Sequence, residues 1–402
     1  MKQLVVKKER SYFVNKTALT KMLPQVYLTC FQSQLSAAEL LTLEILVWLL
    51  QAHKQVRIER LAALFPEPIK FESRRRRLQR FLILPKLSLP LLWFPLIKYI
   101  LRSRCKKAEW LRVVIDRTQW RNENLFVVSV IWEKRAIPIY WQLLSKKGSS
   151  NLVEQKALLR PVFRILKGYK FIVIGDREFR SVKLADWLNQ QGVYFAVRLK
   201  KDSYIQQQGA EYQTLDSLGL APGMKMFFTG LKVTKQQGFG NFNLAAYWKR
   251  KYRGTAASNE GWYILTNLES LTAALDAYQA RSGIEAMFKD CKTGGYNLEG
   301  CHASKSRLLG LVLILAIAYS CMLLFGRKIK NMGLQKYISR LTQLGRVQRR
   351  HSSFWVGLYG YMWVAGMEFL SNLVTKFWQL TPNKLPNFQQ GLRAMELIQS
   401  AL

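Results

Sequence analysis

Two aspartates follow strongly apolar segments at positions where a shared chemical site could form. Asp116 comes directly after Leu111–Ile115, and Asp176 closes the segment Phe171–Gly175. In open α/β sheets, functional groups gather at the carboxyl ends of neighbouring strands, so both carboxylates are expected at one edge of a sheet. There they could share a metal ion, because carboxylate oxygens are ligands that hard cations prefer. Aspartates after strands also serve as turn or capping residues, and taken singly each of these two fits that interpretation.

A third acid, Glu285, stands among basic and phenolic residues. Tyr278, Arg281, Glu285 and Lys292 follow one another at intervals of three, four and seven, within a helix expected from Leu271 to about Lys292. Such intervals place side chains along one stripe of a helix. A carboxylate on that stripe could bind a metal ion while its neighbours hold a phosphate. Spacing alone also fits a surface ladder of ion pairs.

The charge balance indicates a polyanionic partner. Lys and Arg number 62 against 25 Asp and Glu in 402 residues, for a formal net charge of +37. Nucleic acid is the first partner to expect, and an anionic membrane surface is the second. The five cysteines form no CxxC pair and there are three histidines, which disfavours a zinc site or a disulfide framework and fits a reducing cytoplasm. No apolar signal-peptide core follows Met1.

The middle of the chain predicts an α/β domain with the order βββαβαβ. Apolar, β-branched runs predict strands, and helical periodicity predicts helices between them. The expected strands are Leu111–Ile115, Leu125–Trp132, Ile137–Leu144, Lys170–Ile174 and Val193–Leu199, and the expected helices are Asn151–Leu166 and Val182–Gln191. Glutamines, glycines and short β-like runs between Lys200 and Gly261, followed by a strand at Trp262–Thr266, are interpreted as an insertion.

Helices are expected on both sides of this domain. Helical spacing marks Leu35–Leu50, and a short helix over Arg57–Phe65 stops at Pro66. An arginine-rich helix follows from about Phe71 to Leu84. The pair resembles a DNA-binding helical unit, although a solvated basic face on an ordinary helical bundle explains it equally well. The candidate phosphate contacts are Arg74, Arg75, Arg76 and Arg77.

One uncharged apolar run, Leu308–Phe325, has about the length that spans a bilayer. Basic residues stand on both sides of it, Lys305 and Arg307 before and Arg327 and Lys328 after, so the positive-inside rule favours neither orientation. A buried core helix is the preferred interpretation, within a C-terminal region that is expected to be helical, and a membrane protein is the alternative.

Taken together, the motifs resemble those of the DDE transposases of bacterial insertion sequences. The matching segments are Asp116-Arg117-Thr118, Gly175-Asp176-Arg177-Glu178-Phe179, and the series Tyr278, Arg281, Glu285 and Lys292. That series is similar, at all its positions and spacings, to the Tyr-Arg-Glu-Lys signature of a subgroup of insertion-sequence family four (IS-four). The resemblance is close from about Trp110 to Lys292 and extends to the flanking regions only in type.

The resemblance implies an RNase H-like catalytic core with a β-rich insertion at about 201–268, before the helix of Glu285. The expected regions are an N-terminal helical DNA-binding region over 1–107, the catalytic domain over 108–302 and a C-terminal helical region over 303–402. Asp116, Asp176 and Glu285 would be the catalytic residues and the ligands of two Mg²⁺ ions, for which Mn²⁺ can substitute. Tyr278, Arg281 and Lys292 would position terminal phosphates.

The activity implied is metal-dependent endonuclease cleavage at the element ends, followed by strand transfer to target DNA. The expected partners are terminal inverted repeats, target DNA and a second copy of the chain in a synaptic complex, in the nucleoid of a bacterial cytoplasm and away from membranes. Some members stack a flipped base on an aromatic residue, but Ser282 stands where such a residue precedes the glutamate. A non-catalytic, helix-turn-helix DNA-binding protein remains the alternative function.

Overall fold

The computed structural model describes residues 22–120, 123–144, 146, 148–235, 238–250, 260–345 and 350–402. The part of the expected N-terminal region before residue 22 lies outside the described residues. The chain divides into two compact units, Ile97–Lys289 and a second one formed by Met1–Leu96 with Asp290–Leu402. The division into regions at 107 and 302 that we predicted from the sequence stays a prediction.

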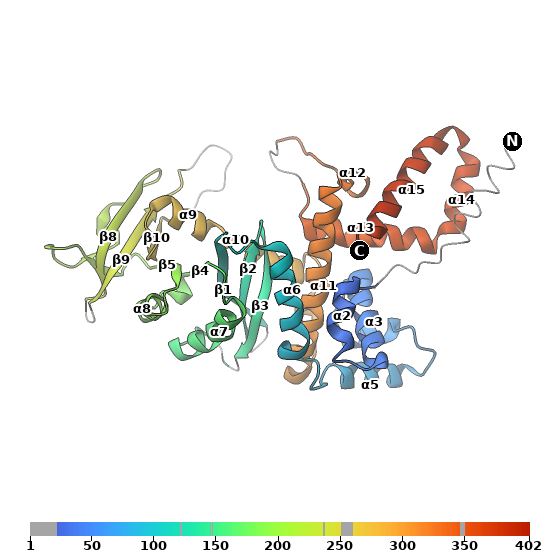
Figure 1. Cartoon of the computed structure of the whole chain (residues 1–402), viewed down its shortest axis with the longest axis horizontal. Coiled ribbons are helices and arrows are strands. Elements are labelled where there is room, and N and C mark those ends of the chain that lie inside the picture. The colour runs from blue at the N-terminus through green and yellow to red at the C-terminus, as the bar shows by residue number, and fades with distance from the viewer. Residues whose placement is uncertain are drawn as a thin grey trace. The chain divides into compact units, whose positions relative to one another are not determined.

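The unit Ile97–Lys289 is mixed α/β, as expected, and is built on one large sheet (Figure 1). Within the described residues the sheet has ten strands in the order β3-β2-β1-β4-β5-β10-β9-β8-β6-β7. The strands of its first half are β1 (Leu111–Trp120), β2 (Glu123–Trp132), β3 (Arg135–Leu144), β4 (Phe171–Gly175) and β5 (Tyr194–Arg198).

The first half of the sheet is antiparallel on one side and parallel on the other. β1 pairs antiparallel with β2 and β2 with β3, whereas β1, β4 and β5 run parallel. The crossovers are helices α7 (Leu152–Ile165) and α8 (Val182–Gln190), which contact each other through the stacked rings of Phe163 and Trp187, 5.6 Å apart. The elements therefore follow in the βββαβαβ order expected from periodicity.

The expected insertion extends the same sheet. Its strands are β6 (Tyr204–Gln206), β7 (Gln213–Thr214), β8 (Lys225–Val233), β9 (Phe239–Tyr247) and β10 (Trp262–Thr266). β10 pairs antiparallel with β5 and with β9, and β9 with β8. Hydrogen bonding thus continues from the first half of the sheet into the insertion.

Two expected boundaries were wrong. β1 runs on from Ile115 to Trp120, because its pairing with β2 continues after its parallel pairing with β4 ends. The helix expected from Leu271 to Lys292 is two helices, α9 (Leu271–Gln279) and α10 (Ser282–Cys291). Backbone hydrogen bonds at the junction connect residues three positions apart instead of four. The hydroxyl of Ser282 donates to the carbonyl of Gln279 at 3.1 Å.

The second unit is helical in its described residues (Figure 1). Its N-terminal helices are α2 (Gln25–Gln32), α3 (Ala37–His53), α4 (Ile58–Leu64), α5 (Phe71–Phe81) and the π-helix η1 (Leu89–Trp93). Its C-terminal helices are α11 (Lys305–Asn331), α12 (Gln335–Ile338), α13 (Ser353–Phe369), α14 (Ser371–Leu380) and α15 (Leu385–Ser400). Helix α6 (Phe94–Arg104) contains one of the boundaries between the units.

Helix α11 forms the centre of the helical unit. By length and composition it could cross a membrane, but 89% of its most apolar window is buried within the structure. It packs against α3 and α13. Gly326 of α11 and Gly357 of α13 allow the two backbones to touch, since a Cβ at Gly326 would lie 1.8 Å from the carbonyl oxygen of Ser353. Packing inside the unit therefore accounts for the apolar run Leu308–Phe325.

Candidate active site

Asp116 and Asp176 lie side by side at one edge of the parallel strands. Ile115 of β1 is in register with Gly175 of β4, and each aspartate is the next residue along its chain. Asp176 also caps the short 3₁₀ helix η2 (Arg177–Phe179), accepting a hydrogen bond from the Glu178 N–H at 2.8 Å. Asp176 is therefore a capping residue, and its part in a metal site stays a prediction.

Glu285 lies in the first turn of α10, which packs against β2. A Cβ at Gly283 would lie 2.9 Å from Ile131 Cδ1, so a larger residue could not approach the strand as closely. The hydroxyl of Ser129 contacts the Met287 sulfur at 3.8 Å. These contacts fix the start of α10 on the sheet, and the Glu285 side chain is left 54% exposed.

Arg281 connects two of the three acids. Its Nη1 lies 3.5 Å from Asp116 Oδ2, and its Nη2 donates to Glu285 Oε1. Arg281 stands in the junction between α9 and α10, so the expected single helical stripe from Tyr278 to Lys292 was wrong. The break in the helix turns the guanidinium toward β1 while Glu285 stays one turn away.

The negative charges of the three acids repel one another. The pKa of Asp116 is raised to about 7, first by burial and then by the negative charges of Asp176 and Glu285. The Arg117 N–H and the Arg281 guanidinium act in the opposite direction. Like charges close together disfavour ionisation, so the site is one where an added cation would be stabilised.

Tyr278 is buried beside these charges. Burial raises the pKa of its hydroxyl, whereas the charges of Arg281 and Arg198 and a hydrogen bond from Arg198 lower it. Its ring packs edge-on against Trp262, with centroids 5.0 Å apart. Trp262 thus belongs to an aromatic cluster with Tyr278 and Tyr247.

Sequence reasoning missed Arg198 and the partner of Arg117. Val197 of β5 is in register with Gly175, so Arg198 ends the third parallel strand beside the two aspartates; the strand-end rule applied to β5 would have found it. Arg117 forms an ion pair with Glu178 and donates to Asn124 Oδ1 at 3.0 Å. This pair ties the loop after β4 to β1.

Lys292 lies just past the end of α10, in the helical unit. There its Nζ is 3.2 Å from Glu299 Oε1. Of the expected signature residues, the structure therefore groups Tyr278, Arg281 and Glu285 with the aspartates in one unit, and Lys292 belongs to the other.

The arginines of α5 differ in their surroundings. Arg74 donates to the Phe65 carbonyl at 3.2 Å, Arg75 lies 3.2 Å from Glu72, and Arg77 lies 2.6 Å from Glu67. Arg76 is exposed and forms no ion pair with any residue the structure describes. One turn later Arg80 is also exposed. The face that carries Arg76 and Arg80 is thus the one open to a phosphate backbone.

No metal-holding group of three His, Cys, Asp or Glu side chains is found among the described residues. The donor set nevertheless suits a hard divalent cation, because it consists of carboxylates whose mutual repulsion such an ion would relieve. Arg281 supplies positive charge at this place.

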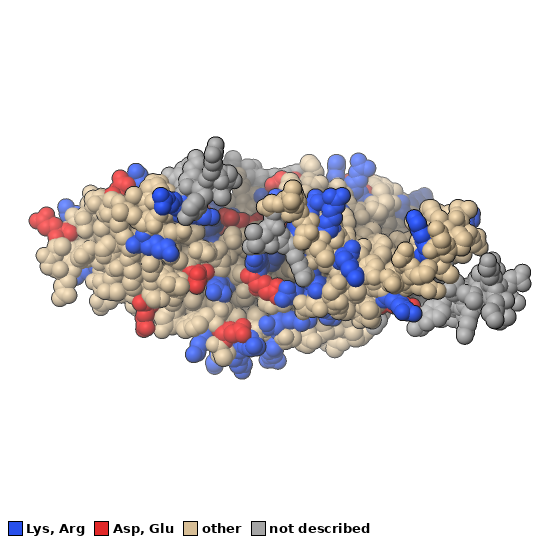
Figure 2. All heavy atoms as spheres, turned by 90° about the horizontal axis from the view of Figure 1, so that it is seen from above, with Lys and Arg blue, Asp and Glu red and all other residues tan. Residues whose placement is uncertain are grey.

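Basic side chains are spread over the surface of both units, as the face in Figure 2 shows. A phosphate backbone approaching either unit therefore meets predominantly positive charge, which favours association with nucleic acid.

Comparison with known proteins gives one family match. The family model described as Transposase DDE domain matches residues 112–321, a span that contains Asp116, Asp176 and Glu285. Among solved structures, the chain is similar to a piggyBac transposase in a synaptic complex with hairpin DNA, determined by cryo-electron microscopy. The sequence identity is 10%, the TM-score 0.42, and the match covers 90% of this chain and 80% of that one. No curated protein matches the sequence.

Proposed function

The chain belongs to the transposase DDE domain family, and from this premise we propose that it mobilises a bacterial insertion sequence. In this proposal it cuts DNA at the ends of the element and joins them to target DNA. The observation that carries it is the register of β1 and β4, which puts Asp116 beside Asp176, together with Arg281, which links Asp116 to Glu285.

We propose Asp116, Asp176 and Glu285 as the catalytic carboxylates. Their oxygens would hold two Mg²⁺ ions, for which Mn²⁺ can substitute. When bound, such a pair of ions supplies charge stabilisation to the attacking and leaving oxygens of a phosphodiester. The protein's part is to hold the carboxylates on two adjacent strands and one helix so that little reorganisation accompanies the reaction.

Arg281 and Tyr278 are proposed to position the phosphate. A guanidinium offers a planar fork of donors that suits two phosphate oxygens at once. In the structure this fork contacts Asp116 and Glu285, which supports a role beside the proposed carboxylates. Lys292 is proposed to contact DNA as well, from its place after α10.

The finer classification also belongs to this proposal. Strand order β3-β2-β1-β4-β5, antiparallel through β1 and parallel beyond it, supports an RNase H-like core. The Tyr278, Arg281, Glu285 and Lys292 spacing supports membership of the IS-four subgroup. The β-rich segment between Asp176 and Glu285 supports an insertion of the kind this subgroup carries.

The proposed partners are the terminal inverted repeats, the target DNA and a second copy of the chain that holds the other element end. The net charge of +37 supports a nucleic-acid partner and a place in the nucleoid. The buried position of α11 supports a role that does not involve a membrane.

The test is cleavage of labelled element-end DNA by the purified full chain with Mg²⁺. Asp116→Asn, Asp176→Asn and Glu285→Gln keep the side-chain shapes and remove the charges, so each should abolish cleavage. Asp276→Asn is the matched control, because Asp276 is an exposed acid of α9. It should cleave as the unaltered protein does.

Cleavage that survives any of the three site substitutions would overturn the assignment of the carboxylates. DNA binding without any cleavage by the unaltered protein would favour the non-catalytic DNA-binding function instead.

A further inference from the structure

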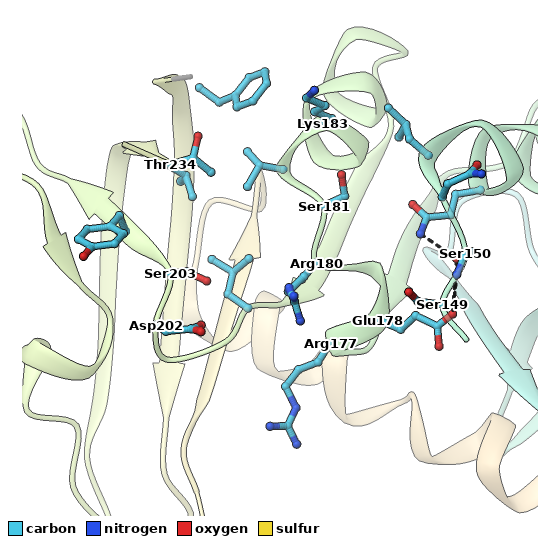
Figure 3. Close-up of a pocket in the computed structure, with 18 of the residues that line it drawn as sticks. Ser149, Ser150, Arg177, Glu178, Arg180, Ser181, Lys183, Asp202, Ser203 and Thr234 are labelled. Atoms are coloured by element: carbon cyan, nitrogen blue, oxygen red, sulfur yellow. Dashed lines mark hydrogen bonds between the residues drawn. The ribbon is translucent and has the colours of Figure 1, made fainter. Parts of the chain in front are cut away.

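The α/β unit contains a cavity of about 950 Å³ that none of the proposed carboxylates lines (Figure 3). It lies between the segment after β3, the start of α8 and the strands β6, β8 and β9. The loop that carries Asp176 continues directly into its wall through Arg177, Glu178 and Arg180. The cavity therefore adjoins the proposed active site along the chain.

One wall of the cavity is held by a chain of hydrogen bonds. Gln155 Nε2 donates to Ser150 Oγ at 2.9 Å, and the Ser150 N–H donates to Glu178 Oε1 at 3.3 Å. Arg117 pairs with the other oxygen of Glu178. Figure 3 shows Ser150 and Glu178 turned toward each other. The wall is thus formed before any ligand arrives, which lowers the ordering cost of binding.

A second wall offers donors to an anion. Helix α8 begins at Val182, and the side chain of its N-cap Ser181 accepts no capping hydrogen bond. Helix α7, whose N-terminus also reaches the cavity, is closed by a capping box between Asn151 and Glu154. Free N–H groups at a helix start bind phosphate readily.

Three cations line the same cavity. Arg180, Lys183 and Lys235 line the cavity and form no ion pair with residues the structure describes. The lining acids are Glu178, which is neutralised by Arg117, and Asp202. The cavity therefore carries excess positive charge.

Two buried oxygens beside the cavity lack a hydrogen-bond partner among the residues that the structure describes. Gln155 is 2% exposed, and its Oε1 has no hydrogen-bond partner among the described residues. Thr234 Oγ1 is likewise buried and has no partner within the described part of the chain, on a residue held in the left-handed region at φ 68°. Leaving such groups unpaired is costly, so side-chain rotations that offer them to a ligand's N–H or O–H would be favoured. A phosphodiester by itself carries no such donor.

A ligand that suits both walls combines a phosphate with a donor-bearing ring. The aromatic residues Tyr204 and Phe239 and the apolar Leu199 and Val233 complete the lining, and such surfaces stack on or pack against bases. A nucleotide has all of these groups, and the volume falls in the range of small-molecule sites, roughly 300–1,000 Å³.

We propose that this cavity binds one nucleotide of a DNA strand, with its phosphodiester at the start of α8 and its base toward Gln155. The inference rests on the proposed function, because it is this activity that brings a DNA strand past Asp176. It adds a subsite that would hold the strand beside the cut.

The test measures binding of a labelled single-stranded oligonucleotide to the full chain by fluorescence anisotropy in EDTA, across a salt series. Lys183→Ala should weaken affinity roughly tenfold at low salt and reduce the slope of log affinity against log salt by about 0.7, the value for one phosphate on single strands. Lys167→Ala, an exposed lysine after α7 that does not line the cavity, is the matched control and should leave the slope unchanged.

The base contact has its own readout. An oligonucleotide with abasic positions should bind the unaltered protein several-fold more weakly than a complete one. Gln155→Met, which removes the acceptor at similar volume, should reduce that difference. If Gln155→Met fails to fold, Ser203→Trp provides a second variant, because a bulky ring at the cavity wall should block the nucleotide and weaken binding to both oligonucleotides.

Identical salt slopes for Lys183→Ala and Lys167→Ala would overturn the proposal. A second result would also overturn it. If a free deoxynucleoside monophosphate or inorganic phosphate binds, and Lys183→Ala abolishes that binding but leaves DNA affinity unchanged, the cavity holds a free phosphate compound. These binding measurements do not depend on cleavage, so they can be interpreted even if the protein has no catalytic function. If the protein cleaves DNA but Lys183→Ala binds DNA as the unaltered protein does, only the nucleotide subsite is refuted.

Discussion

The contact between α11 and α13 predicts opposite effects for the same substitution at two places on one helix. In Gly357→Ala the new Cβ would lie 1.9 Å from the Met322 carbonyl oxygen and 2.8 Å from the Gly326 nitrogen. Both are backbone atoms of α11, so no side-chain rotation relieves the clash. The helices must separate, or the backbone must distort, before alanine fits.

The size of the effect follows from this geometry. Ordinary contact with a Cβ begins at 3.4 Å, so the helices would have to move apart by about 1.5 Å. A gap of about 0.5–1 Å already removes a quarter to a half of a van der Waals attraction, and α11 and α13 share the centre of the unit. Overpacking of this kind costs about 1–3 kcal/mol or more, and we expect about 3 kcal/mol for Gly357→Ala.

Gly366→Ala is the matched control on the same helix. A Cβ there would have no neighbour within 4 Å among the described residues, so alanine should only relieve the low helix propensity of glycine. We expect a gain of about 0.5–1 kcal/mol in the free energy of unfolding.

The assay is thermal unfolding of the full chain, with hydrogen exchange of the α11 and α13 amides assigning the transition to the helical unit. At roughly 2–4 °C for each kcal/mol in a domain of this size, Gly357→Ala should melt about 6–12 °C lower, and Gly366→Ala slightly higher than the unaltered protein. Equal melting temperatures for the two variants would refute the close approach of the helix backbones.

Other predictions concern the active-site loop, the arginine helix and a thiol. Arg117→Ala should lower stability by about 1–3 kcal/mol in thermal unfolding, because it leaves the Glu178 carboxylate, 12% exposed, without its cationic partner. Arg117→Ala with Glu178→Ala should recover part of that loss. Arg76→Glu should weaken DNA binding without changing the melting temperature, whereas Arg77→Ala should lower the melting temperature by breaking its contact with an acid; the reverse pattern would show that the wrong face was assigned. Burial, and then a nearby glutamate, raise the pKa of the Cys105 thiol to about 11, so the native thiol is protonated at pH 8. Its alkylation rate in the native protein should therefore rise until about pH 11, whereas in denaturant the rate should level off near pH 9. Equal pH profiles in both states would contradict the buried environment.

The neighbouring positions of Asp116 and Asp176 could be predicted from the sequence, because they depend on local patterns. Apolar, β-branched runs mark the strands, and a chain that alternates strand and helix returns its strands parallel, so residues after two such runs reach the same edge. The same reasoning applied to β5 would have added Arg198, which ends the next parallel strand.

The break between α9 and α10 could not be read from periodicity. The spacing from Tyr278 to Lys292 fits one helix, whereas α9 ends at Gln279 and α10 begins at Ser282, where a Cβ at Gly283 would lie 2.9 Å from Ile131 Cδ1 of β2. A helical pattern reports which residues share a face if the helix continues, but not whether a strand elsewhere in the chain interrupts it.

The arginines of α5 also show a difference between what the sequence and the structure establish. Composition established that the chain attracts polyanions, but it does not separate Arg76, which is open to solvent, from Arg77, which is bound to Glu67. The sequence by itself thus determined the order of the elements, the two aspartates that follow neighbouring residues of β1 and β4, and the sign of the surface charge. The tertiary structure decided which charges are already paired and how the cavity beside Asp176 is lined, because these depend on contacts between residues far apart in the chain.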